Sequence, residues 1–428
     1  MRPIGLKIKN NEAYIHEYKI EELAKEYQTP LYILDEEDIN YKIDLYLKYF
    51  KGEKFTSSIV YASKALLLPE LVKIINNKGL YMDAVSLGDL YIAKHSGFNM
   101  EKIVFHGNNK SIEELTYAIE NGVGLIVVDN LFELKLLNSL LKDSNKTINI
   151  LIRVNPGIEA HTHKYIQTSK LTSKFGESIF DEDIIEKLVT VCKGSNNINL
   201  LGFHAHIGSQ IHDVESYLVE IDKMIEFQNN VSLKYDIKLP VINLGGGFGI
   251  KYTKDEKNAS LDEMMEKMSL RIDEALSKVK STIQDVMIEP GRSIVGNAGI
   301  TVYTCSQIKH TFGGKNYLFI DGGMTDNIRP ALYDATYECD VVNKMNNEKT
   351  VLVDVVGKCC ESGDIVRRDV MIPQIETNDQ LIVYATGAYN YSMSSNYNSH
   401  LKPAVIMVGK NVKVVSRRES LEDLMKLF

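Results

Sequence analysis

The 428-residue sequence has no long apolar run and little cysteine. No stretch approaches the roughly 18 apolar residues that a membrane-spanning helix needs. Residues 1–20 lack the apolar core of a secretory signal peptide. The five cysteines are scattered, without the paired spacing of a zinc ribbon or finger. These absences argue against a membrane span, a disulfide scaffold and a structural zinc site, and we expect a cytoplasmic protein.

The chain also lacks the basic surplus of a protein that binds nucleic acid or an anionic membrane. Its formal net charge is -8, with 44% apolar and 25% charged residues, as in ordinary globular proteins. It has no internal repeat, low-complexity tract or Pro/Gly/Ser-rich linker. Because 428 residues exceed the usual size of one core, we expect two domains and small-molecule chemistry.

From about residue 30, short apolar runs alternate with longer amphipathic segments, which is typical of parallel strands connected by helices. Eight such runs predict strands, and they end at Lys64, Ser86, Gly107, Asn130, Asn155, Ser209, Gly247 and Arg292. Eight strands alternating with helices predict an α/β fold, a closed TIM-type (β/α)8 barrel over residues 30–293.

After Arg292 the pattern changes to alternating or fully apolar runs with few helix-length segments. This change predicts an all-β domain, like a sandwich or barrel, over residues 294–428. Residues 1–29 contain one strand-like run and one short helix, too little to fold alone, so we assign them to the β domain.

Unusual polar and glycine residues fall at the carboxyl ends of the predicted barrel strands, where barrel enzymes have their active sites. Lys64 follows the first strand, where a lysine near a phosphate cofactor can form a Schiff base; a solvated surface lysine is the alternative. Gly245, Gly246 and Gly247 end the seventh strand, and they either open backbone N–H groups to a phosphate or form a tight turn.

Glu289, Gly291 and Arg292 end the eighth strand, and barrels often bind phosphate with the loops after strands seven and eight. Phosphate binding is therefore predicted here.

His204 and His206 lie two residues apart on a predicted strand, so we expect them to face the same side. They either line the barrel or, with His161, His163 and His212, bind a metal. No carboxylate has a diagnostic spacing among them, which favours a core or cofactor-contacting role.

Loops of the predicted β domain combine polar and aromatic residues, which indicates binding unless each loop is only a surface turn. The residues concerned are Arg329, Tyr333, Cys360, Glu361 and Tyr389.

In chain order, YASKA, HIGSQ, NLGGGFGI, EPGRS, RPALY, CESGD and GAYNYSMSSNYN resemble the diaminopimelate decarboxylases over nearly the whole chain. These are fold-type III decarboxylases that use pyridoxal 5'-phosphate (PLP). The first four motifs also occur in ornithine and arginine decarboxylases, whereas the last three indicate diaminopimelate. The resemblance implies conversion of meso-2,6-diaminopimelate to L-lysine and CO2, the last step of lysine biosynthesis by this route.

Three alternatives stay open from the sequence. The first is a decarboxylase of another basic amino acid or a carboxylated polyamine on the same fold. The second is a metal-dependent barrel hydrolase, and the third is a noncatalytic barrel that binds PLP.

The resemblance also implies the cofactor contacts. Lys64 carries PLP, His206 stacks on the pyridine ring, and Glu289 bonds the pyridine nitrogen and keeps it protonated. The remaining implied contacts come from Asp83, Ser86, Ser209, Gly246, Gly247, Pro290, Gly291, Arg292 and Tyr389.

By the same resemblance, the substrate is held by Arg292, Arg329, Tyr333, Glu361 and Tyr389, with Glu361 on the distal ammonium. Cys360 is the implied proton donor, reaching the site of the other subunit, so a homodimer with composite sites is expected. No metal is implied. The chain departs from the family pattern at Cys359, and at Ser169, where relatives often have glycine.

Overall fold

The computed structural model describes residues 1–142, 144–158, 173–257 and 259–428. The chain forms two compact units. One, here the barrel unit, consists of Ile43–Gly249 and Asn258–Gly291, and the other, the sheet unit, consists of Met1–Lys42, Ile250–Lys257 and Arg292–Phe428. Helix α2 (Glu36–Tyr49) contains the first chain boundary between them.

The barrel unit is a closed cylinder of eight parallel strands, so the predicted barrel is confirmed. The strands are β5 (Thr56–Tyr61), β6 (Tyr81–Ala84), β7 (Ile103–Phe105), β8 (Leu125–Val128), β9 (Ile148–Asn155), β11 (Ile198–His204), β12 (Val241–Asn243) and β13 (Asp285–Ile288). Each pairs in parallel with the next, and β13 pairs with β5 to close the barrel. The short β10 (Glu177–Ser178) pairs in parallel with the end of β9.

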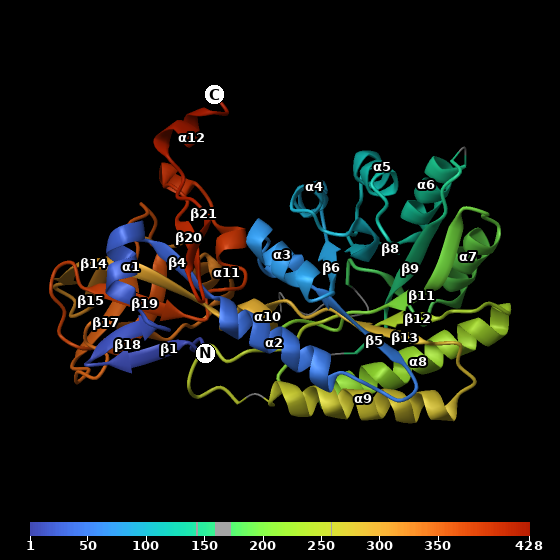
Figure 1. Ribbon diagram of the computed structural model, residues 1–428, viewed down its shortest axis with the longest axis horizontal. Helices are drawn as coiled ribbons and strands as arrows, with labels where there is room; N and C mark the ends of the chain where they lie inside the picture. Colours follow the sequence, from blue (N-terminus) through green and yellow to red (C-terminus); the bar gives the residue numbers. More distant parts are fainter. Residues whose placement is uncertain (143, 159–172, 258) are drawn as a thin grey trace. The chain divides into compact units, whose positions relative to one another are not determined.

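Helices surround these strands (Figure 1) and bury their apolar faces. They are α3 (Pro69–Asn77), α4 (Leu87–His95), α5 (Ile112–Glu120), α6 (Leu131–Leu141), α7 (Glu182–Lys193), α8 (Glu215–Tyr235) and α9 (Leu261–Lys278). Side-chain caps set where several begin: Ser86 caps α4, Ser111 forms a capping box with Glu114 on α5, and Asn130 caps α6. Because Ser86 and Asn130 each lie two residues after a strand, α4 and α6 begin just beyond the ends of β6 and β8.

The sheet unit is built on a nine-stranded sheet, with strand order β18-β17-β15-β14-β4-β20-β21 and with β19 pairing to both β14 and β16. The strands are β4 (Leu31–Asp35), β14 (Gly299–His310), β15 (Asn316–Ile320), β16 (Cys339–Val341), β17 (Val351–Val356), β18 (Ile365–Ile372), β19 (Gln380–Tyr384), β20 (Ala404–Val408) and β21 (Val412–Ser416). A separate antiparallel sheet contains β1 (Leu6–Lys9), β2 (Glu12–Ile15) and β3 (Tyr18–Lys19).

Residues 31–35 fall within the predicted barrel domain, yet they form β4, which pairs with β14 and β20 in the sheet unit. All five residues of β4 are buried. A largely apolar strand has the same sequence pattern in either kind of buried sheet, so the pattern does not indicate which sheet the strand joins. The domain limits given by the sequence remain a prediction.

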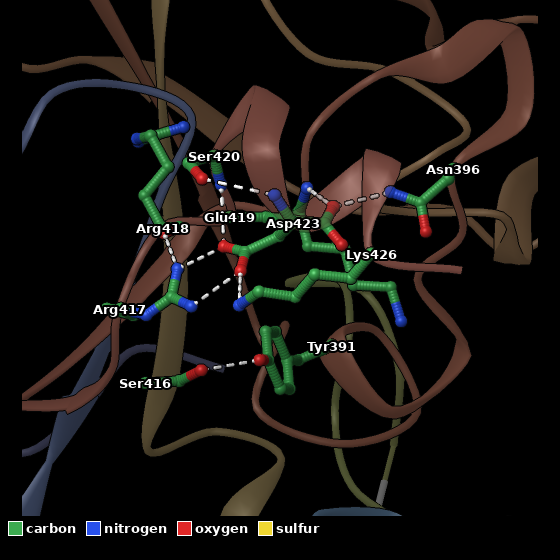
Figure 2. A network of polar contacts seen from close by, with 10 residues as sticks. Tyr391, Asn396, Ser416, Arg417, Arg418, Glu419, Ser420, Asp423 and Lys426 are labelled. Carbon is green, nitrogen blue, oxygen red and sulfur yellow. Dashed lines mark hydrogen bonds and ion pairs between the residues drawn. The ribbon is translucent and has the colours of Figure 1, made fainter. Parts of the chain in front are cut away.

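The sheet unit also contains the short helices α1 (Ile20–Tyr27), α10 (Arg292–Val295), α11 (Arg329–Tyr333) and α12 (Leu421–Met425). Figure 2 shows the contacts around α12: Ser420 caps the helix, Arg417 and Lys426 both bond the Asp423 carboxylate, and Tyr391 bonds Ser416. Such exposed ion pairs contribute little to stability individually. Nowhere in the described ranges is there a helix long and apolar enough to cross a membrane.

Candidate active site

The turn after β5 presents Lys64. Ser63, Lys64 and Ala65 form a single 3-10 turn, in which the lysine side chain is exposed while both neighbours are buried. The backbone N–H of Ser63 donates to Oδ1 of Asp83, at the end of β6, over 2.5 Å. Burial raises the pKa of Asp83 to about 6, although the positive charge of Lys64 acts in the opposite direction. Asp83 therefore anchors the turn that carries the lysine.

Glu289 follows β13 and is buried among three polar side chains. Its Oε1 lies 2.8 Å from Nε2 of His106 and 2.8 Å from Nδ2 of Asn243, and its Oε2 lies 3.3 Å from Nε2 of His204. Burial alone would raise the pKa of Glu289, but the interactions with His106 and His204 outweigh it and hold the pKa well below its usual range. Glu289 is therefore a carboxylate even though it is buried.

His204 and His206 contact different groups. His204 ends β11 and meets Glu289, with its ring 4.8 Å from that of His106, whereas Nδ1 of His206 accepts the Gly246 N–H over 3.3 Å. Burial, and next the positive charge of Lys64, lower the pKa of His206 well below its usual value, so its ring is neutral. Of the further histidines in the metal alternative, His161 and His163 lie outside the described residues.

Glycine loops after β12 and β13 pack backbone against backbone. A Cβ atom at Gly246 would lie 2.0 Å from the carbonyl oxygen of Glu289. Gly247 has φ +104°, and a Cβ there would lie 2.2 Å from the carbonyl oxygen of Gly208. Only glycine fits these positions, and together they leave a rim of bare backbone of the kind that binds phosphate.

Other predicted cofactor residues have structural contacts of their own. The carbonyl of Pro290 accepts the Ala62 N–H over 3.0 Å, and a Cβ at Gly291 would lie 2.7 Å from the Cβ of Ala62. Ser86 accepts the Asp89 N–H as the cap of α4, and Ser209 lies half-buried in the loop after β11. Their predicted contacts with PLP stay predictions.

The residues that hold these groups in place were not predicted from the sequence. His106 directly follows β7 and Asn243 ends β12, so both share the strand-end position that singled out Lys64 and Glu289. Further along, Lys110 Nζ pairs with Glu133 Oε1 over 2.6 Å and donates to two carbonyls, with both side chains nearly inaccessible. The sequence signal that could have identified His106 and Asn243 is a polar residue at or directly after the end of a short apolar run.

The sheet unit brings two of the predicted arginines together with tyrosines. Arg292 donates to the Tyr252 hydroxyl over 2.5 Å, and its guanidinium lies 4.6 Å from the Tyr389 ring centroid. The Arg329 guanidinium lies 5.3, 5.6 and 5.9 Å from the ring centroids of Tyr252, Tyr333 and Tyr389, respectively. Tyr252 was not predicted, because its segment, Ile250–Lys257, lies between barrel segments in the chain.

Arg329 is 7% exposed, yet its guanidinium is incompletely satisfied. Within residues 1–142, 144–158, 173–257 and 259–428, its Nε has no hydrogen-bond partner and no carboxylate pairs with it. A buried cation is costly without an opposite charge. This arginine is therefore suited to a carboxylate of a ligand, which a guanidinium can bind with two hydrogen bonds.

Cys360 and Glu361 lie in the loop between β17 and β18, and both side chains are exposed. The backbone N–H of Cys360 donates to Oδ1 of Asn398 over 2.8 Å, and Oε1 of Glu361 accepts the Gly363 N–H over 3.3 Å. Cys359 is half-buried, and burial, with a contribution from Asp364, raises its pKa to about 11. Cys360 is therefore the more accessible thiol of the pair.

Comparisons with known proteins agree with this geometry. The family described as "Pyridoxal-dependent decarboxylase, pyridoxal binding domain" matches residues 36–296. The diaminopimelate decarboxylase of Bacillus subtilis (strain 168) is 42% identical, over 95% of this chain and 92% of the relative. That of Staphylococcus aureus (strain COL) is 38% identical, over 97% of both. The crystal structure of the diaminopimelate decarboxylase from M. jannaschii in co-complex with L-lysine has a TM-score of 0.91 at 32% identity, covering 100% of this chain and 98% of that chain.

The barrel, the glycine rim and the buried carboxylate define a PLP-dependent decarboxylase. The residues fit this cofactor. The bare backbone of the glycine rim can bind its phosphate, the Lys64 amine can react with its aldehyde, and the ionised Glu289 can bond its ring nitrogen. Within that class, the chain belongs to the diaminopimelate decarboxylase family. The predicted family, enzyme class and cofactor are thereby confirmed, whereas the roles of single residues remain predictions.

Proposed function

We propose that this protein decarboxylates meso-2,6-diaminopimelate to L-lysine and CO2, as the last step of lysine biosynthesis by the diaminopimelate route. The observation that carries the proposal is the buried, ionised Glu289, held by His106, His204 and Asn243. Bound PLP supplies a conjugated ring that accepts the electron pair left when a carboxylate departs as CO2. A carboxylate beside the ring nitrogen keeps that nitrogen protonated, which strengthens the electron sink.

In this proposal the barrel domain binds the cofactor. Lys64 holds it covalently, and Asp83, through the Ser63 N–H, fixes the turn that directs the lysine. His206, neutral because of its burial, can lie against the ring without adding a charge. The backbone around Gly246 and Gly247, with Ser209 and Tyr389, would hold the phosphate.

The β domain binds the substrate. Arg329 and Arg292 would hold carboxylates, and Glu361 would bind the ammonium of the distal centre. Such charged pairing distinguishes the two ends of the substrate, because a wrongly oriented end would leave buried charges unpaired. Arg329 supports this assignment most directly, since it is buried and lacks an anionic partner in the described chain.

Cys360 would deliver a proton to the carbon that has lost CO2, and solvent would then reprotonate its thiolate. By family resemblance it does so in the partner subunit, so we propose a homodimer with composite sites, located in the cytoplasm. The exposure of Cys360 in the single chain supports this role.

Reduction with borohydride tests the proposal. PLP-loaded protein is reduced and digested, and the mass of the cofactor is expected on the peptide that contains Lys64. Lys64→Ala should lose both the adduct and CO2 release, whereas Lys73→Ala, a change at an exposed lysine of α3, should keep both. CO2 release is also measured with lysine, ornithine and arginine. An adduct elsewhere, or a preference for one of these amino acids, would contradict the proposal.

A further inference from the structure

The loop that carries Cys360 and Glu361 has a backbone held from several sides. The N–H of Gly357 donates to the carbonyl of Asp364 over 3.0 Å, and the N–H of Asp364 donates to the carbonyl of Glu361 over 3.1 Å. The N–H of Lys358 donates to the carbonyl of Gly322 over 3.2 Å. The loop therefore presents the exposed side chains of Cys360 and Glu361 on a fixed backbone.

The side chain of Asp364 holds the loop from beneath. It is 3% exposed, and its two oxygens accept the Met324 N–H over 2.6 Å and the Cys359 N–H over 2.8 Å. A Cβ at Gly323 or Gly357 would approach the carboxylate to 2.4 or 2.2 Å, so both glycines leave room for it. Asp364 thus ties the loop to the segment after β15.

Asn398 holds the amide of Cys360 itself, over 2.8 Å. Its backbone lies in the left-handed region, with φ 51° and ψ 25°, which asparagine tolerates better than most residues. The same stretch is tied to the segment after β15, because the Ser395 N–H donates to the carbonyl of Thr325 over 3.0 Å. Asn398 and Asp364 thereby fix two consecutive amides, those of Cys360 and Cys359.

We propose that Asn398 and Asp364 are positioning residues for Cys360, and that Asn398 sets the direction in which the thiol is presented. The inference rests on the proposed function, in which this thiol donates the proton. Proton donors act only within hydrogen-bond reach of their target, so the loop backbone controls turnover. Glu361, on the same loop, binds the distal ammonium in the proposal, so substrate affinity also falls when the loop moves, but less than turnover, because the two arginines lie outside the loop.

Two variants at one position test this role. Asn398→Gly removes the acceptor oxygen and keeps the left-handed backbone accessible. Asn398→Asp keeps both an acceptor oxygen and tolerance of that backbone. In the holoenzyme we expect Asn398→Gly to lower kcat by about 100-fold, because a misplacement of about 1 Å can cost that much. KM should rise by a much smaller factor, because Glu361 lies on the same loop but the two arginines do not. Asn398→Asp should restore most of kcat.

Hydrogen exchange of the 357–364 peptide gives a readout that does not depend on activity. We expect faster exchange in Asn398→Gly and slow exchange in Asn398→Asp, both in the protein without added PLP. Wild-type kcat in Asn398→Gly, or failure of Asn398→Asp to restore it, would overturn the positioning role.

Cys360→Ala separates this inference from the proposed function. We expect Cys360→Ala to lose turnover while the hydrogen exchange of the 357–364 peptide stays unchanged. If Cys360→Ala is inactive while Asn398→Gly turns over normally, the positioning role alone fails. Full turnover in Cys360→Ala would overturn both the proton-donor assignment and the positioning role.

Discussion

Buried charged groups of the candidate site in the barrel unit and in the sheet unit differ in whether they have partners within the protein. In the barrel unit, Glu289 has three polar partners and the buried Lys110 is paired with Glu133. In the sheet unit, Arg329 is buried without an anionic partner among the described residues, and Cys360 is exposed. Glu289 and Lys110 thus have their partners within the protein, whereas no carboxylate of the described residues pairs with Arg329.

This difference matches the two ligands of a PLP decarboxylase. A cofactor stays bound through many turnovers, so the groups around it can be fixed by permanent protein contacts. A substrate enters and leaves at every turnover, so its binding groups must regain their unpaired state each time. Binding a carboxylate to an unpaired buried arginine then gives both affinity and discrimination.

Breaking the barrel's internal pairing should have the largest effect. Glu133→Gln leaves the Lys110 ammonium buried without its counter-charge. Removing one partner of a buried ion pair typically costs about 3 to 5 kcal/mol, so we expect a large fall in melting temperature. Calorimetry of the purified wild type and of Glu133→Gln measures this change in melting temperature.

The matched control is Asp423→Asn in the exposed network of Figure 2. Its partners, Arg417 and Lys426, are mostly solvent-exposed, so we expect an unchanged melting temperature. Equal effects of the two substitutions would show that burial does not distinguish these pairs.

A second, smaller effect concerns pH. Burial raises the pKa of Asp83 from 3.8 to about 6, so the folded protein binds a proton there that the unfolded chain has lost. Stability therefore falls as pH rises from about 4 to about 6, by up to about 3 kcal/mol for a shift of this size. Asp83→Asn can still accept the Ser63 N–H, and it removes this pH dependence.

The measurement is unfolding of the protein without PLP, followed from pH 4 to 8. We expect the wild type to lose stability relative to Asp83→Asn as pH rises. Asp326 in the sheet unit, whose pKa burial raises to about 7, gives a comparison, because Asp326→Asn should act over a window that extends to higher pH. Parallel curves for wild type and Asp83→Asn would contradict the assigned ionisation.

Sequence patterns predict the barrel well, because parallel strands buried on both faces appear as short apolar runs at regular intervals. They also identify Lys64 and Glu289, since each directly follows such a run. They do not identify His106 or Asn243 as partners of Glu289, because that relation depends on how three strands converge when the barrel closes.

The sheet unit was harder to predict. β4 is as apolar as a barrel strand and joins its sheet from far away in the chain. β18 carries no apolar run of the kind that marks the other strands, because four residues at its centre, Val366–Asp369, include three charged ones, as suits an edge strand. Tyr252 contacts Arg292 and Arg329 from a segment embedded in the barrel sequence. Contacts between residues so far apart in the chain do not produce a periodic pattern in the sequence.

The smallest expected effect concerns Arg329, the buried arginine without a carboxylate partner among the described residues. Arg329→Lys keeps the positive charge but loses the planar fork that binds a carboxylate with two hydrogen bonds and lies among tyrosine rings. We expect kcat/KM for meso-2,6-diaminopimelate to fall about 30-fold, or about 2 kcal/mol, mainly through KM. Arg368→Lys, a change at an exposed arginine of β18, should leave kcat/KM unchanged. If Arg329→Lys behaves like this control, charge alone suffices at position 329, and the planar guanidinium is not required to bind the substrate carboxylate.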